Sequence, residues 1–129
     1  ADGARAEATT LRLVHVCDCP SEYAGDERNN LLQAFGKRGF EQGRNLDLVT
    51  YDANVLGREP KGGPLSLLGK GAAGKPYADF LSRQLTFKPT QLVLASGVRA
   101  ALGAREASRG TPVVFWRLTD PVGFDLIQT

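Results

Sequence analysis

Hydrophobic and polar positions along the chain follow two patterns, one typical of buried strands and the other of amphipathic helices. Short apolar or alternating runs predict strands at Leu11–Cys17, Leu46–Tyr51, Gln91–Ala95 and Pro112–Leu118. Apolar residues at helical spacing predict helices from Ser21 or Asp26 to Arg38, over Tyr77–Phe87 and over Val98–Arg109. A last helix is expected to start at Thr119–Pro121, where the proline fits the first turn.

This alternation predicts an α/β fold with a doubly wound, mainly parallel sheet, because each strand is followed by a helix that crosses back over the sheet. We expect the flavodoxin-like strand order 2-1-3-4. Gly39 is expected to end the first helix in a left-handed conformation, with Phe40 folding back onto the last turn. Ser96 and Gly110 are expected to cap the start and the end of the helix after the third strand.

The chain divides into a disordered lead-in at residues 1–10 and a single α/β lobe at residues 11–129. Within the lobe, residues 53–75 hold six of the fifteen glycines, which predicts a long irregular excursion. The segment Gly69–Pro76 imitates a phosphate-binding loop, but Pro76 stands where Ser or Thr would bind Mg²⁺. We therefore interpret this segment as a glycine-rich linker that leads into the next helix.

Composition and charge narrow the classes of function. Apolar residues make up 42% of the chain and charged residues 23%, which is typical of a folded globular protein. The balance of 16 Lys and Arg to 14 Asp and Glu is too even for an electrostatic nucleic-acid binder. No apolar run approaches the ~18–20 residues that span a bilayer. The small, polar start fits a signal peptide that has been removed, so we expect a periplasmic or extracytoplasmic location.

Residues near the end of the first strand allow several kinds of chemistry. Cys17 and Cys19 flank Asp18, and they can form a metal site, a redox pair or inert packing groups. His15 has no evident partner carboxylate, so we interpret it as a satisfied core histidine rather than a catalytic base. Trp116, on the fourth strand, is interpreted as a core residue rather than a stacking platform. Neither a metal nor a cofactor is expected.

Ligands of doubly wound sheets bind beyond the carboxyl ends of the strands, where helix N-termini point their free N–H groups. Asp18 either faces this crevice or caps the following helix. Two other loops offer hydroxyls and N–H groups for a carboxylate or phosphate, and Asp120 offers an acceptor for an ammonium, although both loops can also serve only as helix caps. The candidate ligand-binding residues are Asp18, Ser21, Ser96, Gly97, Val98, Thr119, Asp120, Pro121 and Val122.

Two segments carry a family resemblance. Residues 100–115 end in Thr111-Pro112-Val113-Val114 and are followed by the turn Thr119-Asp120-Pro121-Val122-Gly123. Residues 35–46 link the first helix to the second strand through Gly43-Arg44-Asn45. Together these segments resemble ABC-transporter substrate-binding proteins of the tryptophan/tyrosine-binding type, which have a similar proline-containing strand, Asp-Pro-Val turn and Gly-Lys/Arg-Asn link.

The resemblance implies one lobe of a type I periplasmic binding fold, in the non-enzymatic solute-binding component of an ABC importer. Such a protein presents a small ligand, here an amino acid or a related small acid, to a membrane permease. By this resemblance the Ser96 turn holds a ligand carboxylate, and the Thr119-Asp120 turn contacts the polar head. The resemblance covers residues 11–127, and a missing second lobe or a homodimer partner is expected to complete the cleft.

Two other functions stay open at this point. The same kind of lobe can act as an extracytoplasmic ligand-sensing module of a signalling system. A small thiol or redox protein that uses Cys17 and Cys19 is the third reading of the sequence.

Overall fold

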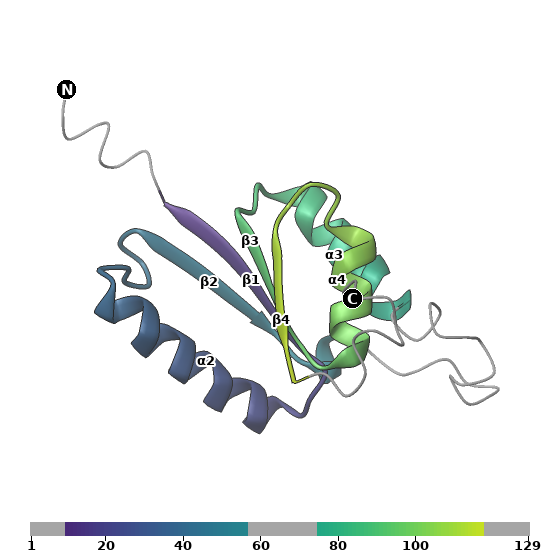
Figure 1. Cartoon of the computed structure of the whole chain (residues 1–129), viewed down its shortest axis with the longest axis horizontal. Coiled ribbons are helices and arrows are strands. Elements are labelled where there is room, and N and C mark those ends of the chain that lie inside the picture. The colour runs from purple at the N-terminus through teal and green to yellow at the C-terminus, as the bar shows by residue number, and fades with distance from the viewer. Residues whose placement is uncertain (1–9, 57–74, 118–129) are drawn as a thin grey trace, which may run out of the picture.

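The structure is a computed structural model that describes residues 10–56 and 75–117. A sheet of four parallel strands in the order β2-β1-β3-β4 lies between helices on its two faces (Figure 1). The strands are β1 (Leu11–Cys17), β2 (Leu46–Tyr51), β3 (Leu92–Ser96) and β4 (Val113–Trp116). The helices are α2 (Ser21–Lys37), α3 (Lys75–Phe87) and α4 (Val98–Ala107), and a 3-10 helix, η1 (Ala53–Leu56), follows β2.

The sequence-based expectation of an α/β fold with flavodoxin-like strand order is confirmed. β1 and β2 have the predicted bounds, and α2 starts at Ser21, the earlier of the two predicted positions. The third strand begins one residue later than predicted and runs on through Ser96. This extension matters for the site, because it makes Ser96 part of the sheet rather than of the following turn.

The two faces of the sheet are covered by different helices, α2 on one side and α3 with α4 on the other (Figure 1). Successive side chains of a strand point to opposite faces. Val14 and Val16 of β1 therefore pack in one cluster with Leu81 of α3, whereas Leu13 belongs to a second cluster that includes Phe35 of α2. Both clusters are buried, so the sheet is sandwiched as a parallel sheet requires.

The end of α2 forms as the sequence predicts. Gly39 has φ +91°, the N–H of Gly39 donates to the carbonyl of Gly36 at 3.1 Å, and the N–H of Phe40 donates to the carbonyl of Phe35 at 3.0 Å. This pair of hydrogen bonds is a Schellman motif. Phe40 also packs against the same apolar cluster as Phe35. The left-handed glycine and the returning phenylalanine together set the direction in which the chain enters β2.

The predicted caps of α4 are wrong at both ends. Gly97, with φ +95°, precedes the helix, and no side chain caps its first turn. Ser96 cannot cap because strand alternation turns its side chain toward the α2 face, where its hydroxyl donates to Glu27 at 2.7 Å. The helix ends at Ala107, so Gly110, with φ +94°, lies beyond the helix end rather than at it.

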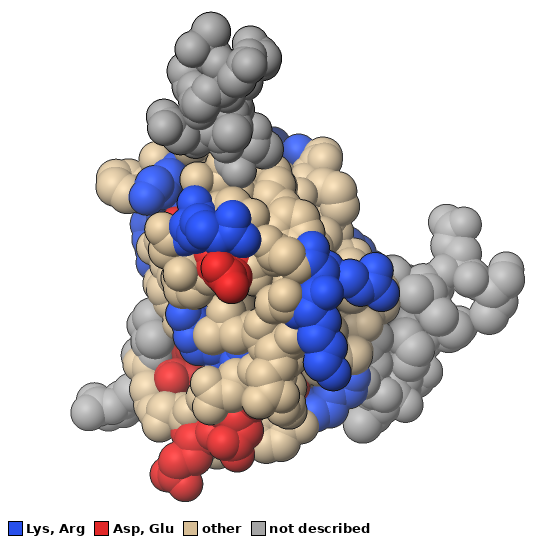
Figure 2. Space-filling model, turned by 90° about the vertical axis from the view of Figure 1, so that its left-hand side faces the viewer, with Lys and Arg blue, Asp and Glu red and all other residues tan. Residues whose placement is uncertain are grey.

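Several expectations concern residues outside the two described ranges. These are residues 1–9 of the lead-in predicted for residues 1–10, residues 57–74 of the excursion predicted for residues 53–75, and the helix expected to start at Thr119. None of the described helices has the length and apolar composition needed to cross a membrane. On the face shown in Figure 2, Lys and Arg side chains stand in separate groups with uncharged surface between them, so this face carries no continuous basic surface.

Candidate functional site at the carboxyl edge of the sheet

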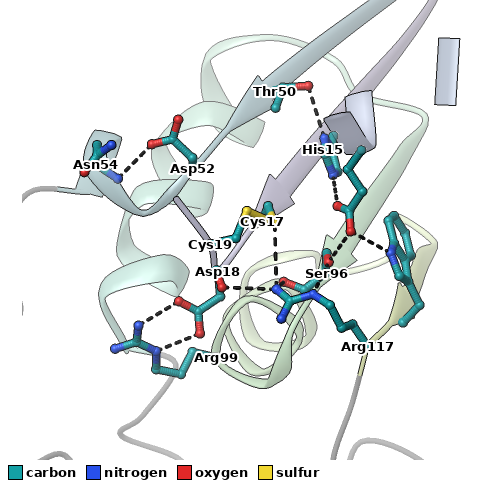
Figure 3. The surroundings of a disulfide bond; sticks show 12 residues. His15, Cys17, Asp18, Cys19, Thr50, Asp52, Asn54, Ser96, Arg99 and Arg117 are labelled. Atoms are coloured by element: carbon teal, nitrogen blue, oxygen red, sulfur yellow. Dashed lines mark hydrogen bonds and ion pairs between the residues drawn. A yellow bond between two sulfur atoms is a disulfide. The ribbon is translucent and has the colours of Figure 1, made fainter. Parts of the chain in front are cut away.

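Polar side chains gather where three of the strands end. Cys17 of β1 pairs with Ser96 of β3, and Ser96 pairs with Trp116 of β4, so these strands end at the same level. Asp18 follows β1 and Arg117 follows β4, and the two residues meet across the end of β3 (Figure 3). We call this region, with Asp18, Ser96 and Arg117 at its centre, the carboxyl edge.

Asp18 is held by two side chains from α3 and α4, the helices that cover one face of the sheet. Nε and Nη2 of Arg99, on α4, donate to its two carboxylate oxygens at 2.8 and 2.7 Å, and the hydroxyl of Tyr77, on α3, donates to Oδ1 at 2.8 Å. Burial would raise the pKa of Asp18, but the hydrogen bonds from Arg99 and Tyr77 outweigh it and lower the pKa below its usual value. Asp18 is therefore a fixed, ionised carboxylate at neutral pH.

Of the two roles predicted for Asp18, the structure favours the position at the crevice. Pro20 is the N-cap of α2, and no side chain donates or accepts a capping hydrogen bond there. Asp18 instead lines an open hollow of about 460 Å³ at the carboxyl edge, which we call the Asp18 hollow. The other lining residues are Cys19, Pro20, Ser21, Glu22, Ala53, Asn54 and Arg99.

Glu27 of α2 is the centre of a second group of polar side chains, and sequence reasoning missed it. Its Oε1 lies 2.7 Å from Nε2 of His15, and its Oε2 accepts hydrogen bonds from Ser96 Oγ at 2.7 Å and from Trp116 Nε1 at 3.0 Å. The side chain of Glu27 is only 12% exposed, so each of these hydrogen bonds forms away from bulk water. We call these four residues the Glu27 network.

His15 is a buried and satisfied core histidine, as predicted, but the statement that it lacks a partner carboxylate is wrong. Nδ1 of His15 lies 3.1 Å from Thr50 Oγ1, which also accepts a hydrogen bond from Arg28 at 3.0 Å. Thr50 therefore donates to Nδ1, and the Nε2–H of a neutral His15 donates to Glu27. Burial lowers the pKa of His15, and Glu27 opposes this effect only in part, so the ring is neutral at pH 7.

The sequence contains one signal that would have identified Glu27. Ala24 is buried and Leu31 packs against the core of the α2 face, and Glu27 lies between them at helical spacing. A carboxylate in the sheet-facing stripe of a helix needs partners, because an unpaired buried charge is strongly unfavourable. The residues that could partner it on that face, His15 and Ser96, become apparent only once the strand register is known.

Arg117 lies across the end of β3. Its Nε donates to Ser96 Oγ at 3.0 Å, and its Nη2 donates to the backbone oxygen of Asp18 at 3.1 Å (Figure 3). The guanidinium also lies over the ring of Tyr23, 5.1 Å from its centroid. A Cβ atom on Gly97 would come within 2.9 Å of Arg117 Nη2, so the guanidinium packs directly on the backbone of the turn.

Two of the three candidate residues of the Ser96–Val98 loop already have hydrogen-bond partners within the protein. The Ser96 hydroxyl is occupied by Glu27 and Arg117, and the Gly97 N–H donates to the carbonyl of Trp116 at 3.0 Å. These groups are therefore not available to a ligand carboxylate in this arrangement. Val98 begins α4. Thr119, Asp120, Pro121 and Val122 lie outside the described residues, so their predicted role stays a prediction.

Cys17 and Cys19 are joined by a disulfide that encloses Asp18, a pairing that the sequence analysis did not propose (Figure 3). Both residues are buried, with 0% and 7% of their surfaces exposed, and they pack with Ala24. Their burial suits packing groups, but the disulfide means that they are not two inert thiols. No three His, Cys, Asp or Glu side chains within residues 10–56 and 75–117 are grouped as a metal site would need.

Neither a protein-family model nor a curated protein sequence matches the chain. Two solved structures are similar to it. One is a conserved domain protein from Vibrio cholerae O1 biovar El Tor, with TM-score 0.66, 21% identity and 94% of this chain covered. The other is the ligand-free, open structure of a substrate-binding protein with adhesive properties from Clostridium difficile, with TM-score 0.63, 18% identity and 93% of this chain covered.

The chain spans 35% of the length of each of these structures. At these identities the likeness is one of fold, and the chain therefore has the fold of a lobe found in a substrate-binding protein.

Proposed function

We propose that the chain is a ligand-binding lobe of the solute-binding component of an ABC importer, and that it holds an amino acid or a related small acid at its carboxyl edge. The observation that carries this proposal is the convergence of Asp18, Arg99 and Arg117 beside the Asp18 hollow. In open α/β sheets, ligands bind in the crevice beyond the carboxyl ends of the strands. The charged side chains and the hollow lie at that place.

The charges and size of the Asp18 hollow fit a small zwitterion. Asp18 and Glu22 bring carboxylates to its lining, and Arg99 brings a guanidinium, so charges of both signs are present. Its volume of about 460 Å³ lies within the range of roughly 300–1,000 Å³ typical of small-molecule sites. The hollow is open to solvent, so a second wall is needed to enclose a ligand.

Three further features support the importer assignment. The fold matches that of a solved substrate-binding protein, and the motifs at residues 35–46 and 100–115 resemble the tryptophan/tyrosine-binding type. The chain spans 35% of that solved structure, which agrees with a second lobe or a second copy as the missing wall. The Cys17–Cys19 disulfide is typical of oxidising compartments and favours an extracytoplasmic location. A membrane permease is then the partner that receives the ligand.

The experiment that tests this proposal is an NMR titration of the isotope-labelled chain with the twenty L-amino acids, each added separately. A lone lobe contacts only part of a ligand, so we expect dissociation constants near the millimolar range, about −4 kcal/mol. At least one amino acid should shift the amide signals of Asp18–Ser21 and Arg99 in a saturable way. The Gly39–Arg44 amides, at the opposite edge of the sheet, should stay unchanged.

A pair of variants makes the titration specific. Asp18→Asn removes the carboxylate from the hollow and should weaken binding at least about tenfold, because charge-assisted hydrogen bonds are the strong ones. Glu106→Gln removes the same charge from an exposed position in the last turn of α4 and should leave binding unchanged. Titrations in which no amino acid gives saturable shifts at the carboxyl edge would contradict the proposed function.

A further inference from the structure

The two arginines at the carboxyl edge differ in how their charge is balanced. Arg99 forms an ion pair with Asp18, with Nη2 and Oδ1 2.7 Å apart. The polar partners of Arg117 are all uncharged: the hydroxyl and carbonyl of Ser96, the carbonyl of Asp18 and Sγ of Cys17. Within the described part of the chain, Arg117 forms no ion pair. At the carboxyl edge, Arg117 thus has no described carboxylate at ion-pair distance, although the charge of Asp18, which is already paired with Arg99, lies nearby.

One side of the Arg117 guanidinium is also left for a further acceptor. The hydrogen bonds of Arg117 with described residues use Nε and Nη2. A guanidinium carries five N–H donors, two of them on Nη1. Arg117 is exposed, so water or a ligand reaches these donors. The two N–H bonds of Nη1 diverge, so one of them can donate to a carboxylate oxygen while the guanidinium charge lies beside that carboxylate.

The position of Arg117 is fixed before any ligand arrives. Its backbone has φ +61°, an uncommon value for a residue with a side chain, and this turn directs it back over the end of β3. Ser96 Oγ accepts the Nε–H of Arg117 while donating its own hydrogen to Glu27. The ring of Tyr23 supports the guanidinium from a third direction. A cation held in this way loses little conformational entropy when it binds an anion.

We propose that Arg117 is the residue that receives the carboxylate of the ligand, and that it selects acids over their uncharged analogues. This inference rests on the proposed function, because it names the part of the ligand that the carboxyl edge recognises. It places the carboxylate on the guanidinium instead of on the Ser96–Gly97 turn, whose hydroxyl and N–H already have partners. Glu27 acts as a positioning residue, because it holds Ser96 and through Ser96 the guanidinium.

The test compares each of the twenty L-amino acids with its own primary amide as NMR probes of the full 129-residue chain at neutral pH. The two molecules of a pair have nearly the same shape, and the amide lacks the negative charge. We expect the acids that bind the wild-type chain to bind at least about tenfold more tightly than their amides. In Arg117→Gln this preference should disappear through weaker binding of the acid. Arg117→Lys, which keeps the charge but loses the Nε–H that Ser96 holds in place, should keep part of it.

Two controls separate this inference from the proposed function and from a loss of folding. Arg44→Gln removes an equal charge at the opposite edge of the sheet, where Arg44 pairs with Glu41, and should keep the wild-type preference. The amide signals of Arg117→Gln report directly whether the variant is folded. Equal binding of acid and amide to the wild-type chain, or a preference that survives in Arg117→Gln, would overturn this inference alone. Binding of neither acid nor amide would overturn it together with the proposed function.

Discussion

The two faces of the sheet use the same strands for different purposes. On the α3 and α4 face, β1 contributes Val14 and Val16 to a continuous apolar cluster with Leu81. On the α2 face, β1 contributes Leu13 to an apolar cluster at one end, but His15 to the Glu27 network at the other. One face is therefore apolar from Val14 to Val16 of β1, with the buried Arg12 at the amino end of the strand, whereas the other changes from apolar to polar on approaching the carboxyl edge.

This difference shows how a small lobe combines a stable core with a polar site. The apolar face gains stability from burial, which does not depend on the direction of each side chain. The polar end of the other face depends on direction, because each buried polar group needs a partner at hydrogen-bond distance. We expect substitutions on the first face to change mainly the free energy of unfolding, and those on the second to change the geometry of the site as well.

The largest effect is expected from Leu81→Ala. Leu81 is 0% exposed in the apolar cluster, and replacing a buried leucine by alanine typically lowers the free energy of unfolding by about 2–5 kcal/mol. Urea denaturation followed by circular dichroism measures this change. Leu31→Ala, at a half-buried position on α2, should cost less, because less apolar surface is lost from the core. The emission of folded Trp116, which packs on the α2 face, should stay the same in Leu81→Ala, and a spectral shift in that variant would show that the two faces are coupled.

Glu27→Gln is the corresponding change on the polar face. Glutamine offers one acceptor oxygen in place of two, so one of the donors from His15, Ser96 and Trp116 would be left without a partner. An unsatisfied buried donor costs about 1–3 kcal/mol, which urea denaturation resolves. The Trp116 emission should shift as well, since its indole N–H donates to Glu27.

The control for this change is Glu106→Gln on the exposed surface of α4, which should alter stability by less than about 0.5 kcal/mol and leave the Trp116 emission alone. If Glu27→Gln changed the stability as little as this control and left the Trp116 emission alone, the hydrogen bonds of the Glu27 network would not stabilise the polar end of the α2 face.

The same contrast explains which parts of the molecule could be predicted from the sequence. The bounds of β1 and β2 and the Gly39 turn at the end of α2 follow from local patterns, because apolar alternation and a left-handed glycine are encoded within a few residues. The strand order follows from the alternation of strands and helices.

Of the candidate site, the sequence predicts a place at the carboxyl ends of the strands and names Asp18, whose binding of a ligand stays a prediction. Ser96 was expected to cap α4 because serine does so in many helices, but its neighbours in space, Glu27 and Arg117, are 69 and 21 residues away in the sequence. Such partners depend on strand register and side-chain direction, which no local pattern specifies. For the same reason the turn of Arg117 back over the end of β3 could not be predicted from local patterns.

An effect no larger than that of Glu27→Gln is expected from Gly97→Ala, which tests how closely Arg117 packs on the carboxyl edge. Gly97 has φ +95° and ψ 157°, a conformation that is essentially restricted to glycine and costs a residue with a side chain about 1–3 kcal/mol, and its new Cβ would approach Arg117 Nη2. Thermal unfolding should show this loss. Gly25→Ala, inside α2 with no atom near the new Cβ, should instead raise stability by about 0.5–1 kcal/mol. A neutral Gly97→Ala would mean that Arg117 is free to move away from the turn.

The smallest effect concerns pH and His15, the one histidine of the chain. Burial lowers the pKa of His15 in the folded state, with Arg28 acting in the same direction and Glu27 against it. The unfolded chain therefore binds a proton more readily than the folded chain, and the stability that His15 contributes is complete above pH 6.5. It is lost as the pH falls through the lower pKa of the folded state.

The change is expected to be small because the carboxylate of Glu27 opposes the effect of burial. Urea denaturation between pH 8 and pH 4.5, together with an NMR titration of the His15 ring, measures the slope and the folded-state pKa. His15→Gln should remove the part of the slope between pH 6.5 and the folded-state pKa and leave the rest of the pH dependence unchanged. A ring that titrates above pH 6.5 in the folded chain would reverse the sign, and it would show that Glu27 rather than burial dominates the polar end of the α2 face.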